Sequence, residues 1–356
     1  MTTITSSTVT ASVVGTLLTG ALLMAPIASA GTAGGERAST ATGTAAGQFG
    51  HANAIEARGP GVFPHSADYD PCSGNFLVTS LKSGTVSTVG RDGTVRTLVN
   101  DPRLVSSQGI RVDGNRVLVT NLDFGVADKS TPDTLLKVAG VGSYDVRTGR
   151  PHWYVDLAAL ADDGREHMVA DVVVAPDGTA YAVDTKAGLV FRIDRQGRAS
   201  VLLRSALLEG HNAVAGLPPN LGSTSVAWVP GDLLIISTAT DGLVRVPVRR
   251  PEQASKVQLD NELSTLVAGV KALPDGSLAV VSSGLENFTP AVVQRVSPSD
   301  RWIKATVTVT DHVVDPITSG ISAGPGGSTF VVTGRLEELL QGLPNKGFLL
   351  RPVRVG

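Results

Sequence analysis

The chain contains one cysteine, Cys72, in 356 residues. An intramolecular disulfide is therefore impossible, and the fold must be stabilised by packing and hydrogen bonds alone. A single cysteine more commonly packs as a small apolar residue than acts as a nucleophile, so we expect Cys72 to be packed in this way.

Charge of either sign is not in excess, and no block of basic residues is present. Thirty Lys and Arg residues nearly balance 32 Asp and Glu residues, which gives a net charge of −2. This balance argues against nucleic acid or an anionic membrane surface as a partner, and we expect a monomer. A His-Glu-x-x-His motif, a phosphate-binding glycine loop and a cysteine pair are also missing, which argues against the enzyme classes that these motifs define.

Charged side chains are absent from the first 35 residues. Within them, Val13–Pro26 is an apolar segment, and Ala28-Ser29-Ala30 has the small residues of a cleavage site. This pattern predicts a signal peptide over residues 1–30, cleavage after Ala30 and a secreted protein, with no membrane contact after cleavage. An uncleaved membrane anchor is the alternative, but Gly20 and the threonines nearby weaken a spanning helix. The Gly-, Ala-, Thr- and Ser-rich residues 31–53 are typical of a disordered linker.

Glycine and proline, by contrast, are plentiful, at 40 and 20 residues. The stretch Asp171–Gly197 shows how they are used. Three short runs rich in Val, Ile, Tyr and Phe are separated by Pro176-Asp177-Gly178 and Lys186-Ala187-Gly188. This arrangement predicts three antiparallel strands joined by tight turns.

Similar strand–turn–strand units recur six times, at spacings of 40 to 64 residues. A repeat of about 50 residues with about four strands is typical of a β-propeller, so we predict an all-β, six-bladed propeller over residues 54–356. A two-sheet sandwich is the alternative, but it does not explain the period. The last repeat is one strand short, and Ala54–Arg58 would supply that strand and close the ring. The six turns begin at Ser73, Asp113, Asp177, Gly231, Asp275 and Gly326.

The long irregular segments fall on one rim of such a propeller, which we call the upper face, and the tight turns fall on the lower face. A site is expected among long loops on a rigid scaffold, although the loops could simply cap the channel. Arg335–Gln341 within them is expected to form a short helix. These segments are Asn121–Leu135, Ala158–Ala170, Ala206–Ser225, Ser282–Pro290 and Gly334–Lys346.

From Ala54 to Val355 the repeat resembles the gluconolactonase and senescence-marker-protein family, and more loosely the strictosidine-synthase-like propellers. The resemblance implies a metal site at the upper channel mouth, where a Glu, an Asn and an Asp just before the innermost strands hold a calcium-type divalent cation that activates water on a lactone. The corresponding positions in this chain are His65, Gln108, Ala170, Thr224, Ala268 and Ser319. None is a carboxylate, whereas hard divalent cations prefer several oxygen ligands that include carboxylates. We therefore expect no metal ligands at these positions.

His65 is the main candidate for chemistry, because imidazole suits proton transfer and the residue begins an inner strand. Asp171 is the second predicted catalytic residue. The alternative for His65 is a channel histidine that is held by hydrogen bonds and has no role in chemistry. The alternative for Asp184, which could line the channel mouth, is a carboxylate that stabilises its blade. His65, His167 and His211 could instead hold a transition metal, and Glu286 lies where the strictosidine-synthase-like propellers carry a catalytic Glu. Predicted substrate-binding residues at the channel mouth are Gln108, Asn121, Asp184, His211, Asn212, Thr224 and Ser319, with Asp123 nearby.

Two classes of function remain open at this point. One is a secreted lactonase-like hydrolase that acts on a small ester, lactone or related metabolite. The other is a non-catalytic extracellular propeller that binds a small molecule, a glycan or a protein on the same face. Fold alone does not separate them, because propellers carry many functions.

Overall fold

A computed structural model describes residues 53–59, 62–213, 217–239, 241–264, 266–284, 289–315, 317–345 and 347–356. They belong to a compact unit, Gly50–Gly356. The predicted signal peptide, its cleavage site and all of the predicted linker except Asn53 lie outside the described residues. Among the described residues, no helix is both long and apolar enough to cross a membrane.

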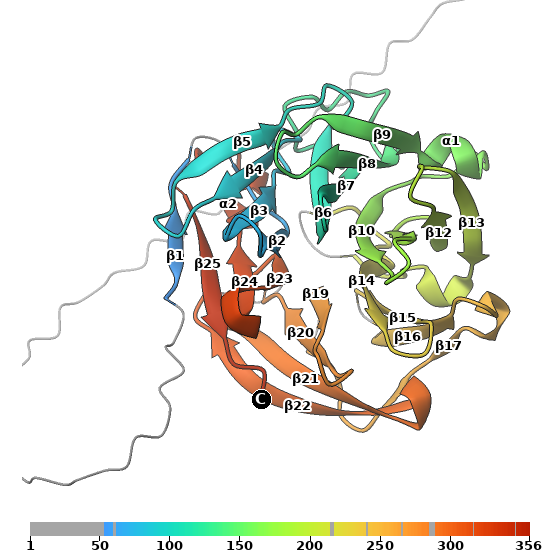
Figure 1. The fold of residues 1–356 in the computed structure, drawn as a ribbon. Coiled ribbons are helices and arrows are strands. Elements are labelled where there is room, and N and C mark those ends of the chain that lie inside the picture. Colours follow the sequence, from blue (N-terminus) through green and yellow to red (C-terminus); the bar gives the residue numbers. More distant parts are fainter. Residues whose placement is uncertain are drawn as a thin grey trace, which may run out of the picture. The chain divides into compact units, whose positions relative to one another are not determined.

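Six small sheets follow one another around a central axis, so the prediction of a six-bladed β-propeller is confirmed (Figure 1). Strands are numbered along the chain, and the first strand of each blade listed here is the one nearest the axis. Blade 1 has β2 (Ala67–Asp70), β3 (Asn75–Thr79), β4 (Val86–Val89) and β5 (Val95–Val99). Blade 2 has β6 (Ser106–Asp113), β7 (Arg116–Leu122), β8 (Ala139–Asp145) and β9 (Pro151–Asp156). Blade 3 has β10 (Val169–Val174), β11 (Ala180–Asp184), β12 (Leu189–Ile193) and β13 (Ala199–Arg204).

The second half repeats the plan with two departures. Blade 4 ends in a strand of two residues, and blade 5 gains a fifth strand, β18, which pairs in parallel with β22. Blade 4 has β14 (Ser223–Val229), β15 (Leu233–Thr238), β16 (Leu243–Pro247) and β17 (Ser255–Lys256). Blade 5 has β19 (Val267–Ala272), β20 (Leu278–Ser282), β21 (Ala291–Ser299), β22 (Lys304–Val313) and β18 (Gln258–Leu259). Blade 6 has β23 (Gly320–Ala323), β24 (Thr329–Thr333), β25 (Phe348–Val353) and β1 (Ile55–Ala57).

Blade 6 confirms the predicted closure, because β1 pairs antiparallel with β25 near the other end of the chain. Ile55 and Ala57 are buried in a cluster with Phe76, Phe330 and Phe348, while Glu56 between them is exposed. Figure 1 shows the blue β1 beside the red β25. The outer edge of the last blade is thereby covered by a strand from outside the repeat.

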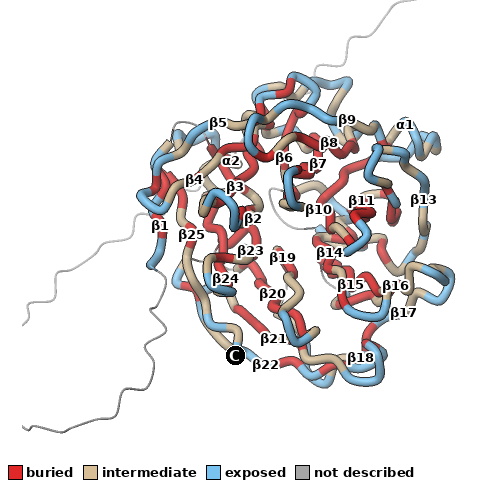
Figure 2. The backbone as a smooth tube through the Cα atoms, viewed as in Figure 1, coloured by how far each residue is buried: buried red, intermediate tan, exposed pale blue. Residues whose placement is uncertain are grey.

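The turns between the first and second strands of the blades need backbone conformations that favour glycine. In blades 3 and 5, Gly178 and Gly276 have φ angles of 83° and 82°. The second strands, such as β11 and β15, are buried along their whole length, because neighbouring blades cover both of their faces (Figure 2).

The prediction for Cys72 is wrong: this residue is exposed, in the turn between β2 and β3.

Among the described residues, two short α-helices lie in the loops between strands. The first, α1 (Leu157–Ala161), follows β9, and Asp156 caps it by accepting a hydrogen bond from the Ala159 amide. The second, α2 (Leu336–Leu340), confirms the helix expected on the upper face.

Candidate functional site

Irregular pairing at the upper end of four inner strands directs side chains toward the axis. The register shifts past Ala170 in β10, Thr224 in β14 and Ala268 in β19. In β6 it shifts between Ser107 and Ile110, so Gln108 also lies outside the regular pairing. A bulge of this kind reorients a side chain and often occurs next to a functional site. His65 and Ser319 just precede the inner strands of the two remaining blades.

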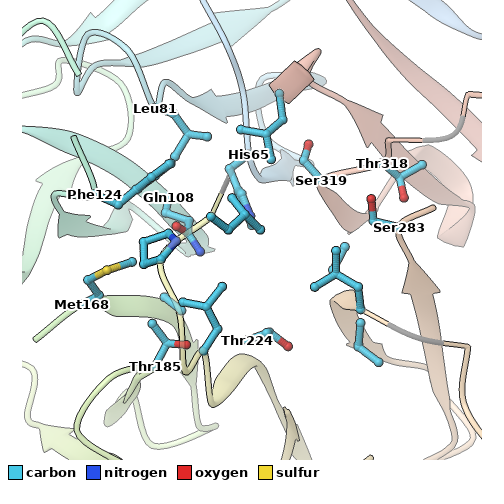
Figure 3. Close-up of a pocket in the computed structure, with 18 residues that line it drawn as sticks. His65, Leu81, Gln108, Phe124, Met168, Thr185, Thr224, Ser283, Thr318 and Ser319 are labelled. Carbon is cyan, nitrogen blue, oxygen red and sulfur yellow. The ribbon is translucent and has the colours of Figure 1, made fainter. Parts of the chain in front are cut away.

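All six of these positions line one partly enclosed cavity on the upper face, with a volume of about 100 Å³. Most of its wall is aliphatic, aromatic or thioether. Figure 3 shows Leu81, Phe124 and Met168 on one side of the cavity, with His65 and Gln108 beside them. The other apolar residues of the wall are Pro218, Leu217, Leu221, Leu266, Val267 and Leu336, together with Ala170 and Ala268.

Four polar side chains of the cavity wall fall into two sets. Thr224 and Ser319 are held by the protein: Thr224 Oγ1 lies 2.9 Å from Ser237 Oγ, and Ser319 Oγ donates to the Pro64 carbonyl at 3.0 Å. The side chains of Gln108 and Thr185 make no hydrogen bond to another described residue. Gln108 and Thr185 are therefore better placed than Thr224 or Ser319 to contact a ligand.

His65 is the only titratable residue in the described wall of the cavity. Its Nδ1 lies 3.2 Å from Ser66 Oγ. Burial lowers the pKa of His65 from 6.5 to about 4, so the ring is neutral at physiological pH. A general base works best when its pKa is near the working pH, so this histidine is a weak base and a good neutral hydrogen-bonding group.

Asp171 is not among the described residues of the cavity wall, and its carboxylate joins three blades. Its Oδ2 accepts hydrogen bonds from Arg111 Nη2 at 3.1 Å, Ser225 Oγ at 2.5 Å and the Val226 amide at 3.1 Å, and its Oδ1 accepts one from the Val172 amide. A carboxylate has about four acceptor positions, and here the protein fills them. Asp171 and His65 share only a narrow constriction of about 10 Å³ below the cavity, room for about one water molecule. In the structure Asp171 therefore holds neighbouring blades together and does not occupy the predicted catalytic position.

Asp184 is fully buried outside the cavity, in agreement with the alternative of a blade-stabilising carboxylate. It accepts hydrogen bonds from the amides of Met168, Lys186 and Ala187, and lies 2.8 Å from His167 Nδ1. Burial lowers the pKa of His167, but the hydrogen bonds and negative charges of Asp184 and Asp163 outweigh this effect and raise it overall. The network fastens the segment after α1 onto blade 3.

The other predicted residues of the channel mouth also lie elsewhere. Asn121 accepts from the amides of Val105 and Ser106, and donates to the Arg103 carbonyl and to Tyr154 Oη. Asp123 accepts hydrogen bonds from Ser130 and Thr134 and so ties down its own loop. His211 is exposed. Asn212 donates to the Leu221 carbonyl at 2.6 Å, and so acts on the cavity only through the loop that carries Leu217 and Leu221.

Metal coordination is a poor fit to these side chains. Among the described residues, no group of three or more His, Cys, Asp or Glu side chains could hold a metal ion, so His65, His167 and His211 do not meet. The described wall of the cavity offers amide, hydroxyl and imidazole groups and no carboxylate, which is the wrong donor set for calcium. Glu286 lies outside the described residues.

Sequence reasoning overlooked one motif. Gly320-Ile321-Ser322-Ala323-Gly324 matches the Gly-x-Ser-x-Gly pattern of serine hydrolases. In those enzymes the serine occupies a sharp strand-to-helix turn. Here Ser322 lies within β23, and its hydroxyl donates to the Ala323 carbonyl at 2.7 Å. The motif is therefore not a nucleophile elbow.

Comparison with known proteins supports the architecture. No protein-family model matches the chain, and no curated protein matches it by sequence. Among solved structures, the major allergen Mala s 1 of Malassezia sympodialis is similar with a TM-score of 0.67 and 14% identity, over 85% of this chain and 96% of that one. A gluconolactonase from Xanthomonas campestris has a TM-score of 0.55 and 13% identity, over 85% and 89%. Regucalcin from Agrobacterium tumefaciens, described as a calcium-binding protein, has 0.55 and 16%, over 86% and 95%.

These similarities confirm the fold predicted from the resemblance, that of a gluconolactonase- and regucalcin-like six-bladed propeller. At such low identity these similarities show the fold alone. The chemistry must be inferred from the residues of the cavity.

Proposed function

We propose that the upper cavity binds a small, uncharged and mostly apolar organic molecule. The observation that supports this proposal is the wall itself: residues from all six blades converge on one cavity, and its described polar groups are all neutral at physiological pH. Ligand sites typically combine an apolar lining with a few polar groups that fix orientation.

The volume suggests the size of the ligand. A cavity of about 150 Å³ accepts benzene, so this open-sided cavity of about 100 Å³ would enclose most of a ring of about five or six atoms and leave the rest in its open upper side. Five- and six-membered lactones, cyclic ketones and cyclic alcohols meet both the size and the polarity requirement. A longer substituent would have to leave through the open upper side.

Titration of such compounds, followed by ligand-observed NMR and by thermal shift, tests the proposal. Ala268→Leu fills the cavity and should weaken binding about tenfold or more. Ala272→Leu is the matched control, because Ala272 lies on the same strand but lines the lower opening of the channel. The proposal fails when no compound binds the wild type, or when the two variants bind equally well.

Hydrolysis of a lactone in the same cavity is the second candidate function, and the position of His65 favours it. The low pKa of His65 makes it a weak base, so we expect slow turnover at most. Acid release from a lactone panel, with and without chelator, measures this directly. Chelator-insensitive turnover that His65→Gln abolishes would establish the hydrolase, whereas turnover unchanged in that variant would remove His65 from the chemistry.

Export is a further part of the proposal, supported by the uncharged apolar segment before Ala30. N-terminal sequencing of protein recovered from the culture medium should begin at Gly31. Protein retained in cells with its full N-terminus would contradict export by cleavage.

A further inference from the structure

Two buried hydroxyl groups in the cavity wall have no hydrogen-bond partner among the described residues, namely Ser283 Oγ and Thr318 Oγ1. Ser283 is 8% exposed and Thr318 is 1% exposed. Buried polar groups are nearly always hydrogen-bonded, because desolvating an unpaired group costs free energy. An unpaired hydroxyl that faces a cavity therefore points to something that the cavity binds.

The two residues come from neighbouring blades. Ser283 directly follows β20 of blade 5, and Thr318 lies two residues before β23 of blade 6. The backbone is fixed near both, since the Ser283 amide donates to the Leu266 carbonyl at 2.9 Å and the Ser319 amide donates to the Val332 carbonyl at 2.8 Å. In Figure 3 both side chains lie on the same side of the cavity, across from Phe124 and Met168. The backbone that carries the two hydroxyls is thus held in place before a ligand arrives.

We propose that Ser283 and Thr318 form a polar subsite that recognises one uncharged oxygen function of the ligand, a carbonyl or a hydroxyl. This inference rests on the function proposed above and specifies its ligand: a cyclic ketone, lactone or alcohol whose ring packs against Leu81, Phe124 and Met168. A hydroxyl group can donate to a carbonyl and can also accept from an alcohol, so both classes fit. A carboxylate or an ammonium group would lose its hydration without gaining a counter-ion in the described wall.

Five compounds built on the same six-membered ring separate these possibilities: cyclohexanone, cyclohexanol, cyclohexane, cyclohexanecarboxylate and cyclohexylammonium. In the wild type we expect the ketone and the alcohol to bind more tightly than the hydrocarbon, and the two ions to bind at least about tenfold more weakly than the ketone. Thr318→Val keeps the shape of the side chain, and Ser283→Ala removes only the hydroxyl. Each should weaken cyclohexanone binding about fivefold to tenfold and leave cyclohexane binding unchanged.

Thermal unfolding without ligand supplies a second readout and a control. Removing an unpaired buried hydroxyl should keep or raise the Tm, so Thr318→Val should lose affinity without losing stability. Thr224→Val is the contrast, because Thr224 is already bonded to Ser237: its Tm should fall and its preference for the ketone should remain.

Each unexpected outcome has a distinct meaning. If Thr318→Val and Ser283→Ala both keep the preference for the ketone over the hydrocarbon, the subsite is overturned while the proposed function stands. If an ion binds as tightly as the ketone, the subsite and the uncharged ligand of the proposed function are both overturned. A loss of Tm in both variants with unchanged preference would assign the hydroxyls a structural role. If none of the five compounds binds the wild type, the proposed function itself fails.

Discussion

His65 shows how one partly buried ring couples the cavity to pH. Burial lowers its pKa to about 4, and among the described wall residues no carboxylate compensates a positive charge there. In the unfolded chain the same ring has an ordinary pKa near 6.5. Acid therefore favours the unfolded chain, which takes up a proton that the folded protein does not.

This difference predicts acid sensitivity over a defined window. The contribution of His65 to the free energy of unfolding is complete above pH 6.5, falls as the pH drops toward 4, and is constant below that. The loss is about 3 kcal/mol, because each pKa unit corresponds to about 1.4 kcal/mol. His65→Gln should remove this part of the pH dependence, as measured by urea unfolding at pH 7.5 and pH 4.

The exposed His211 supplies the control for that experiment. His211→Gln should keep the acid sensitivity of the wild type. Equal sensitivity of the His65→Gln variant and the wild type would show that burial of His65 does not govern its titration.

For single residues, the sequence predicts where a side chain lies in the fold better than it predicts which groups that side chain contacts. The positions of His65, Gln108, Thr224 and Ser319 follow from the resemblance to the propeller family, which places such residues at the start of an inner strand, and the structure brings them to one cavity. Asp171 and Asp184 have similar places in the sequence, yet their partners come from other segments, such as Arg111, Ser225 and His167. Such long-range pairs leave no local pattern, so a carboxylate that braces blades looks the same in the sequence as a catalytic one. Ser283 and Thr318 were missed for a related reason, since a lack of partners cannot be read from a sequence.

At the level of elements, the strands and the seam could be predicted because each depends on local chemistry. Alternating Val and Ile, turns with glycine and the missing last strand all leave direct traces in the sequence. The short β17, the parallel β18 and the shifted register at Ala170 leave none, because they depend on how one blade passes into the next.

The seam strand offers a prediction with an internal control. Ile55→Ala should lower the free energy of unfolding by about 2–4 kcal/mol, because the side chain packs into the cluster between blades 6 and 1. Glu56→Ala, on the same strand but exposed, should change it by less than about 0.5 kcal/mol. Equilibrium denaturation by urea measures both.

Aggregation during heating tests a second role of β1, which is to cover the edge of β25. When β1 detaches, β25 exposes an unpaired edge, so Ile55→Ala should also increase aggregation during heating. If Ile55→Ala and Glu56→Ala have equal effects, the seam contributes little to closure.

For the whole molecule, comparison with solved structures distinguishes the fold, which is shared, from the side chains of the cavity, which determine its chemistry. The propeller is shared with a gluconolactonase and with a calcium-binding regucalcin over most of each chain. In this chain the ring of six cavity positions carries imidazole, amide, hydroxyl and methyl groups. The same scaffold thus presents a neutral, mostly apolar cavity among the described residues here, and the ligand that we propose must match that cavity.

Added calcium tests whether the cavity binds a cation. A site with a Kd of about 1 μM would stabilise the protein by about 4 kcal/mol at about 1 mM calcium, and would raise the Tm by several degrees. Because no carboxylate lies in the described wall of the cavity, we expect calcium to change the Tm by less than about 1 °C, in the same range as added chelator. Cyclohexanone in the same assay should raise the Tm if it binds the folded protein alone. A calcium-dependent rise of several degrees, reversed by chelator and abolished by His65→Ala, would instead place a cation in this cavity and overturn its assignment as a neutral site.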